Sequence, residues 1–178
     1  MTSPRNALFL SAAVMASLSL PPAIAAQYRL PTIVATGSAD SLHAAAVTLS
    51  RQAGRWGDAA RLHHRSAMLR SADDSLGFRC LRVSAHLSYS DHDLSSARSS
   101  MTEAAAQALA RGDLVNAAHS YADAAWVAHE QRRKGEVWKL GRQAEVLAGS
   151  PLLTREQRAS ILNRFVHAHQ DLAVSDRH

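Results

Sequence analysis

The chain has 178 residues, of which 47% are hydrophobic and only 5% aromatic, and its formal net charge is +5. Its length suits a single domain with its own core, and its single cysteine, Cys80, excludes an intramolecular disulfide. Because alanine supplies much of the apolar fraction, helices in this chain must pack closely to bury enough apolar area.

Residues 1–25 have the three parts of a secretory signal. Arg5 lies near the start, an apolar run follows over residues 7–20, and residues 23–25 (Ala-Ile-Ala) form a small-x-small cleavage pattern. The run is shorter than the roughly 20 apolar residues that span a bilayer, so we expect cleavage after Ala25 and no stable transmembrane span in the mature form. The alternatives are an uncleaved anchor and a buried first helix. Export to the periplasm or the medium also argues against nucleic acid as a partner.

Residues 26–38 contain proline and glycine without helical period, which predicts an extended lead-in. A helical domain is expected from residue 39, with Asp40 or Ser41 capping its first helix. Residues 54–58 (Gly-Arg-Trp-Gly-Asp) then predict a turn and a second, returning helix. These two helices form a first hairpin.

The third predicted helix covers residues 76–87, after a cap in residues 73–75, and it ends at residues 90–93. Ser100 and the glutamate three positions later match a capping box, which predicts that the next helix begins there. Residues 94–99 are either a separate short turn or an extension of that helix.

Residues 101–134 predict the central hairpin of the chain. Apolar residues recur at three- and four-residue spacing on both sides of Gly112, which ends one helix, and Asp113, which caps the next. So short a turn makes the two helices antiparallel, with Tyr121 filling the space between facing alanines.

A further helix is expected over residues 137–147, with Val137, Trp138 and Leu140 on its apolar stripe. Thr154 opens a capping box that begins the last helix. The fold prediction is therefore all-α, an irregular stack of antiparallel helical hairpins with about seven helices. The predicted domain covers residues 39–170, and residues 171–178 are predicted to be a flexible tail.

The central hairpin resembles the tetratricopeptide repeat (TPR), with the best match over residues 98–131 and a weaker one over residues 40–73. The small, turn and aromatic positions of that repeat correspond to Ala105, Gly112, Ala117, Tyr121 and Ala124. Met101 and Ala108 stand where the family has aromatic residues, and His129 stands near the usual closing proline.

The resemblance implies a non-catalytic adaptor or scaffold that binds a peptide or protein on a helical groove. The groove positions correspond to Ser41, Ala44, Thr48, Arg51, Ser99, Thr102, Ala106 and Leu109. An acidic partner would suit the arginines of the first half of the chain, although such arginines also occur on solvated helix faces without a partner.

No sequence motif predicts catalysis or a cofactor. The chain has no Gly-x-Ser-x-Gly elbow and no phosphate-binding glycine loop, so we expect no enzyme. No two histidines lie three or four residues apart, the spacing that would place two metal ligands on one helix face. The alternative function is a periplasmic metal- or small-ligand-binding protein that uses histidines from different helices, for instance His64, His86 and a carboxylate. Cys80 lies on an apolar stripe, which favours a buried small hydrophobe over a reactive thiol.

Overall fold

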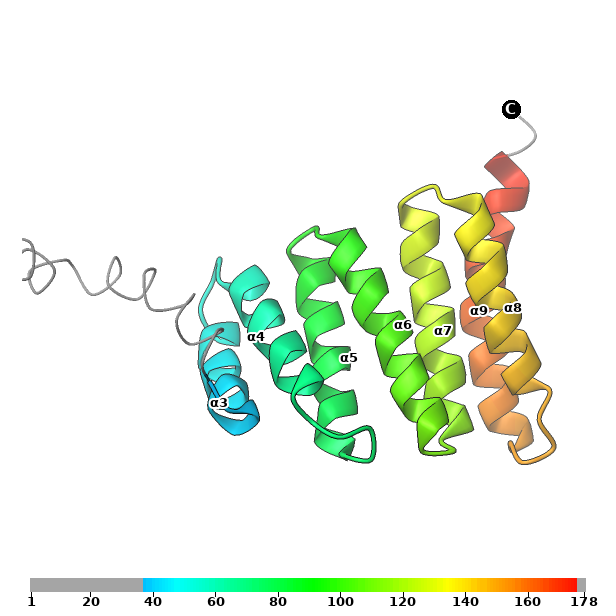
Figure 1. Cartoon of the computed structure of the whole chain (residues 1–178). Coiled ribbons are helices and arrows are strands. Elements are labelled where there is room, and N and C mark those ends of the chain that lie inside the picture. The colour runs from blue at the N-terminus through cyan, green and yellow to red at the C-terminus, as the bar shows by residue number, and fades with distance from the viewer. Residues whose placement is uncertain (1–36, 176–178) are drawn as a thin grey trace, which may run out of the picture. The chain divides into compact units, whose positions relative to one another are not determined.

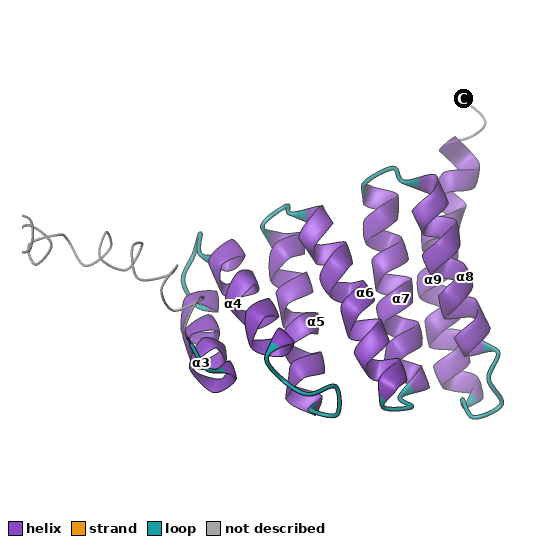
Figure 2. Cartoon of the chain, viewed as in Figure 1, coloured by secondary structure: helices purple, strands orange, loops and turns teal. Residues whose placement is uncertain are grey.

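The computed structural model describes residues 37–175, which form helices and connecting turns without a strand (Figures 1 and 2). The helices are α3 Ala39–Ser50, α4 Trp56–Met68, α5 Ser75–Ser90, α6 Leu94–Ala110, α7 Leu114–Glu130, α8 Lys134–Ala148 and α9 Arg155–Ser175. This confirms the all-α prediction. The predicted signal, residues 1–25, and the lead-in up to residue 36 lie outside the described residues.

Each helix packs against the next one in the chain, and α9 packs against both α7 and α8. Figure 1 shows successive helices running in opposite directions, as their short connections require. The helices of residues 38–178 therefore form a stack of antiparallel neighbours, as predicted. Among the described residues no helix is long and apolar enough to cross a membrane. The predicted domain boundary at residue 170 falls within α9.

Local capping explains where several helices begin. The side chains of Asp74 and Asp113 accept hydrogen bonds from backbone N–H groups in the first turns of α5 and α7. Thr154 and Gln157 exchange hydrogen bonds of 3.2 and 2.8 Å between side chain and backbone, which confirms the predicted capping box.

Two helix starts differ from the predicted caps. The cap of α3 is Ser38, whose hydroxyl accepts from the backbone of Ser41, so the helix begins before the predicted caps. Asp93 caps α6 at Leu94, so residues 94–99 extend the helix, which confirms one of the two predicted alternatives, and Ser100 is a buried residue inside it rather than its cap. Asp93 stands directly after the preceding turn, and it offers an N-cap about two helical turns before the box at Ser100 is reached.

Three consecutive turns share one backbone design. His92, Gly112 and Arg132 each have a positive φ, between 56° and 70°. At each turn the backbone N–H of this residue donates three residues back, and the next N–H donates five residues back, at 2.7 to 3.0 Å. This is the Schellman pattern of helix ends. The turns recur every 20 residues, so two helices of this stack occupy 40 residues, compared with about 34 in a TPR unit.

The core is built from small residues. Alanines of α6 and α7 with no exposed surface face one another, and Tyr121 is the one large aromatic side chain among the described members of the main cluster. Serines add hydrogen bonds between helices: Ser66 donates to the carbonyl of Ala39 at 2.7 Å, and Ser84 to that of Ala60 at 2.9 Å. Small side chains thus bring backbones close enough for such bonds.

Candidate functional site

The groove residues that the resemblance implied lie on α3 and α6. The α3 set is exposed, and it consists of Ser41, Ala44, Thr48 and the C-cap residue Arg51. The α6 set consists of Ser99, Ala106 and Leu109, which are exposed, and Thr102, which is half-buried. Since α4 and α5 lie between α3 and α6 in the stack, the structure does not bring the two sets onto adjoining helices (Figure 1).

Within the α6 set the hydroxyl groups are already engaged in the helix. Ser99 donates to the carboxylate of Glu103 at 3.0 Å, and Thr102 donates to the carbonyl of Arg98 at 3.0 Å. Leu109 differs, because it is a large apolar side chain that is 37% exposed. It is the member of the set that offers apolar surface to a partner.

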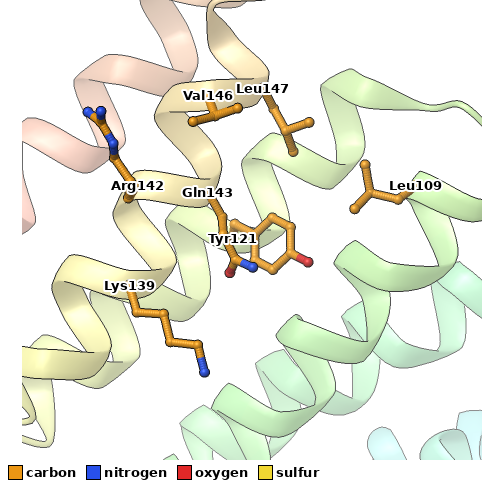
Figure 3. Close-up of a pocket in the computed structure, with 7 residues that line it drawn as sticks. All are labelled: Leu109, Tyr121, Lys139, Arg142, Gln143, Val146 and Leu147. Carbon is orange, nitrogen blue, oxygen red and sulfur yellow. The ribbon is translucent and has the colours of Figure 1, made fainter.

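Leu109 lines a pocket of about 410 Å³, a size typical of small ligand sites. The other lining residues are Tyr121, Lys139, Arg142, Gln143, Val146 and Leu147. Figure 3 shows Leu109 on one wall, with Tyr121 and Leu147 across from it. The pocket therefore joins α6 and α8 over a residue of α7.

The α8 wall follows from helical spacing. Lys139, Arg142, Gln143 and Val146 stand at i, i+3, i+4 and i+7, which places them on one face of the helix. The opposite face is buried through Val137, Leu140 and Ala144. The sequence prediction missed this wall because it assigned the groove to the first helix of each hairpin and did not relate α8 to α6.

The pocket is apolar with a basic edge. None of its lining residues carries a carboxylate, and Lys139 and Arg142 are both cationic. In Figure 3 the Arg142 side chain points away from Tyr121, and it forms a 2.7 Å ion pair with Glu145. The charge at the pocket edge that a bound acidic group would meet is therefore mainly that of Lys139.

The three tryptophans of the chain have different surroundings. Trp56 is the first residue of α4 and is 39% exposed. Trp126 is half-buried and lines a second pocket of about 310 Å³ together with Ala122, Asp123 and Arg164. Trp138, predicted as part of an apolar core stripe, is 61% exposed on α8, so that assignment was wrong. Val137 and Leu140 occupy the buried face in its place.

The second pocket contains an ion cluster. Asp123 of α7 pairs with Arg82 of α5 at 3.4 Å and with Arg164 of α9. Burial lowers the pKa of His86 and of His119, and the two arginines lower both further. Asp123 offsets one of these two cations, so the cluster holds three helices together and carries one net positive charge.

The histidine set suggested by the sequence does not assemble. His64 Nε2 lies 2.8 Å from the carboxylate of Glu103, while His86 belongs to the surroundings of Asp123. The hydrogen bond to Glu103 raises the pKa of His64, and the same bond lowers the pKa of Glu103. This contact joins α4 to α6 and is an ion pair when His64 is protonated, and the example set of His64 with His86 was wrong.

Three other residues that can ligate a metal do come together, one from each of α3, α4 and α5. The ligand atoms of His43, His63 and Cys80 all lie within 4.8 Å of one another. Cys80 Sγ is 3.4 Å from His43 Nδ1, and the two imidazole rings have centroids 5.3 Å apart. Cys80 is 1% exposed, which confirms its predicted burial. Sequence spacing gave no signal for this group, since its members lie on different helices.

Comparison with protein-family models, with curated proteins and with solved structures gave no match to this chain.

Proposed function

We propose that this protein is a non-catalytic binding module that takes up an apolar side chain of a peptide or protein partner between α6 and α8. The observation that carries the proposal is the pocket behind Leu109, whose walls are apolar and whose mouth is open to solvent. The same residue is one of the groove positions that the TPR resemblance implies. Leu109 is the one groove position of the eight that lines this pocket.

Exposed apolar surface continues along α8 beyond the pocket. Val146 is 65% exposed and Trp138 is 61% exposed. The two residues are eight positions apart, which is about 12 Å along α8 and about 80° around it. Exposed large apolar side chains grouped in this way are typical of interaction surfaces.

The partner that fits this surface is a segment with a leucine-, methionine- or phenylalanine-like side chain next to a carboxylate. The apolar side chain would pack against Leu109, Tyr121 and Leu147, which supply the burial energy. The carboxylate would lie near Lys139 at the pocket edge, where it adds orientation more than affinity. Helical stacks commonly bind extended or helical segments on such surfaces.

Selection of peptides from a random library by the immobilised protein tests this proposal. We expect enrichment of peptides in which a large apolar residue lies next to aspartate or glutamate. The combined changes Leu109→Arg and Val146→Arg should reduce recovery of these peptides at least tenfold, because two cations would then occupy the apolar walls.

The matched control is Val83→Arg on α5, since Val83 is 39% exposed and lies outside the pocket. This variant should retain the selected peptides. Equal recovery by the Leu109 and Val146 double variant, or enrichment without any apolar residue, would refute the pocket as the binding site.

Export remains part of the proposal, and the signal pattern of residues 1–25 supports it. An exported module of this kind would act as an adaptor outside the cytoplasm.

A further inference from the structure

The group formed by His43, His63 and Cys80 lies at the α3 end of the stack and shares no residue with the proposed peptide pocket. Each member comes from a different helix, so the packing of α3 on α4 and of α4 on α5 brings the group together. Two imidazoles and a thiol are a known donor set for soft and borderline transition metals.

The spacing of the ligand atoms suits a metal ion. With metal–nitrogen bonds of about 2.0 Å and a metal–sulfur bond of about 2.3 Å, bound N and S atoms lie about 3.5–3.7 Å apart. The observed distance of 3.4 Å between Cys80 Sγ and His43 Nδ1 is close to this value. All ligand atoms lie within 4.8 Å of one another. Small side-chain rotations that move these atoms by about 1 Å would bring all three to bonding distance from one ion.

His63 gives a second, independent indication of a ligand. It is 2% exposed, and its Nδ1 is buried without a hydrogen-bond partner among the described residues. Leaving a buried polar nitrogen unpaired costs about 1–3 kcal/mol, and coordination would remove that cost.

We propose that His43, His63 and Cys80 bind one copper ion, as Cu⁺, in a three-coordinate site. Coordination replaces the Cys80 thiol proton with the metal: the S–H bond breaks, an S–Cu bond forms and one proton leaves to solvent. The two neutral imidazoles add no charge, so one thiolate and one Cu⁺ give a neutral centre.

Charge and ligand number favour Cu⁺ over Zn²⁺ in this position. A divalent ion would leave one net positive charge in a buried site, and such a charge is costly to desolvate. Structural zinc sites also use four protein ligands, whereas trigonal sites with two histidines and one cysteine are typical of copper. Among the described residues the group contains three ligands and no carboxylate. His43 is half-buried, so one member of the group lies partly in contact with solvent.

Titration of the full chain, without a His tag, tests the proposal. Cu⁺ is supplied under reducing conditions against a chromophoric competitor, and Zn²⁺ is titrated in parallel. We expect one Cu⁺ per chain and at least tenfold weaker binding of Zn²⁺ at the same residues. Cys80→Ser and His63→Leu should each weaken Cu⁺ binding at least tenfold, with folding checked by circular dichroism.

The matched control is His64→Gln, because His64 is the adjacent residue on α4 but contacts Glu103. Its affinity for Cu⁺ should equal that of the unaltered chain. X-ray absorption of the copper-loaded chain gives an outcome that does not depend on the variants: one sulfur and two nitrogen neighbours are expected. The proposal would be overturned by a copper ion without sulfur neighbours or by tighter binding of Zn²⁺ than of Cu⁺. It would also be overturned if His64→Gln lost as much affinity for Cu⁺ as Cys80→Ser and His63→Leu.

Discussion

At the scale of single residues, two adjacent histidines of α4 respond to different surroundings. His63 faces the core, and burial first and the neighbouring His43 second lower its pKa to about 4. His64 lies near the surface, and the hydrogen bond to Glu103 raises its pKa against the opposing effect of burial. Adjacent positions on a helix point in directions about 100° apart, which is why neighbours can differ so much.

The lowered pKa of His63 predicts that acid destabilises the fold. Below pH 6.5 the unfolded chain binds a proton at His63 while the folded chain does not, so the free energy of unfolding falls from pH 6.5 down to about pH 4. At about 1.4 kcal/mol per pKa unit, the loss should be roughly 2–3 kcal/mol. Urea unfolding with chelator present measures it, and His63→Leu should remove this part of the pH dependence.

His64 and Glu103 act in another window and provide the control. Because the pKa of His64 is raised in the folded chain, its protonation stabilises the fold below pH 6.5. This stabilisation is lost as the pH rises through the pKa of His64 in the folded chain. Because the pKa of Glu103 is lowered in the folded chain, its ionised carboxylate stabilises the fold above pH 4.5. This stabilisation is lost as the pH falls through the pKa of Glu103 in the folded chain. Both side chains are about one-third exposed, so the pair contributes roughly 0.2–1 kcal/mol, mostly between pH 4.5 and 6.5. The variant His64→Gln should therefore still show the fall in the free energy of unfolding toward pH 4. If it does not, His63 is not the residue that causes this fall.

At the scale of elements, the turns at residues 92, 112 and 132 set the period of the stack. Each reverses the chain with one residue in the left-handed region, which only glycine adopts without steric cost. Gly112 adopts this conformation without steric cost, whereas His92 and Arg132 carry a Cβ and adopt it at a steric cost of about 1–2 kcal/mol each. Because the same turn recurs at equal spacing, the helices between the turns have similar lengths, and neighbouring helices pack along their whole length.

Substituting two glycines tests this account of the turns. An added Cβ at Gly112 or at Gly135 would meet no atom within 4 Å, but only Gly112 has a positive φ. Gly112→Ala should therefore lower the free energy of unfolding by about 1 kcal/mol, and Gly135→Ala, within α8, should raise it by roughly 0.5 kcal/mol. Urea midpoints at constant m-value measure both changes. Equal effects of the two changes would mean that backbone conformation is not the cause.

At the scale of the whole stack, contacts run mainly between consecutive helices. The N-terminal helices α3 and α4 and the C-terminal helices α8 and α9 share no large interface. Stability in such arrays is a sum of local terms and neighbour interfaces, so the ends can open independently.

Deleting buried side chains at the two ends tests this independence. Leu42 in α3 and Ile161 in α9 both have no exposed surface. Replacement of either by alanine should cost about 2–5 kcal/mol. Amide hydrogen exchange should then accelerate mainly in α3 and α4 for Leu42→Ala, and mainly in α7 to α9 for Ile161→Ala. Uniform acceleration along the chain in both variants would show a single cooperative unit instead.

Local sequence signals predicted most of the helical architecture correctly. Asp74, Asp113, Gly112 and Thr154 act on the backbone within a few residues, and the structure confirms their roles. The sequence left the start of α6 open, because capping signals at Asp93 and Ser100 compete within one stretch; in the structure the earlier one, directly after the preceding turn, begins the helix. The exposure of Trp138 was missed because helical period alone does not tell which apolar residues border the neighbouring helix.

The sequence by itself determined that the chain is helical, where most helices end, and that Cys80 is buried, because backbone capping and apolar spacing act over a few residues. Only the tertiary structure decided which side chains meet across helices. Leu109 joins the α8 wall, and His43 and His63 approach Cys80, because the angle and offset of each packed helix pair depend on the fit of both surfaces. Each proposed site combines residues from three helices, and no spacing within one helix encodes that meeting.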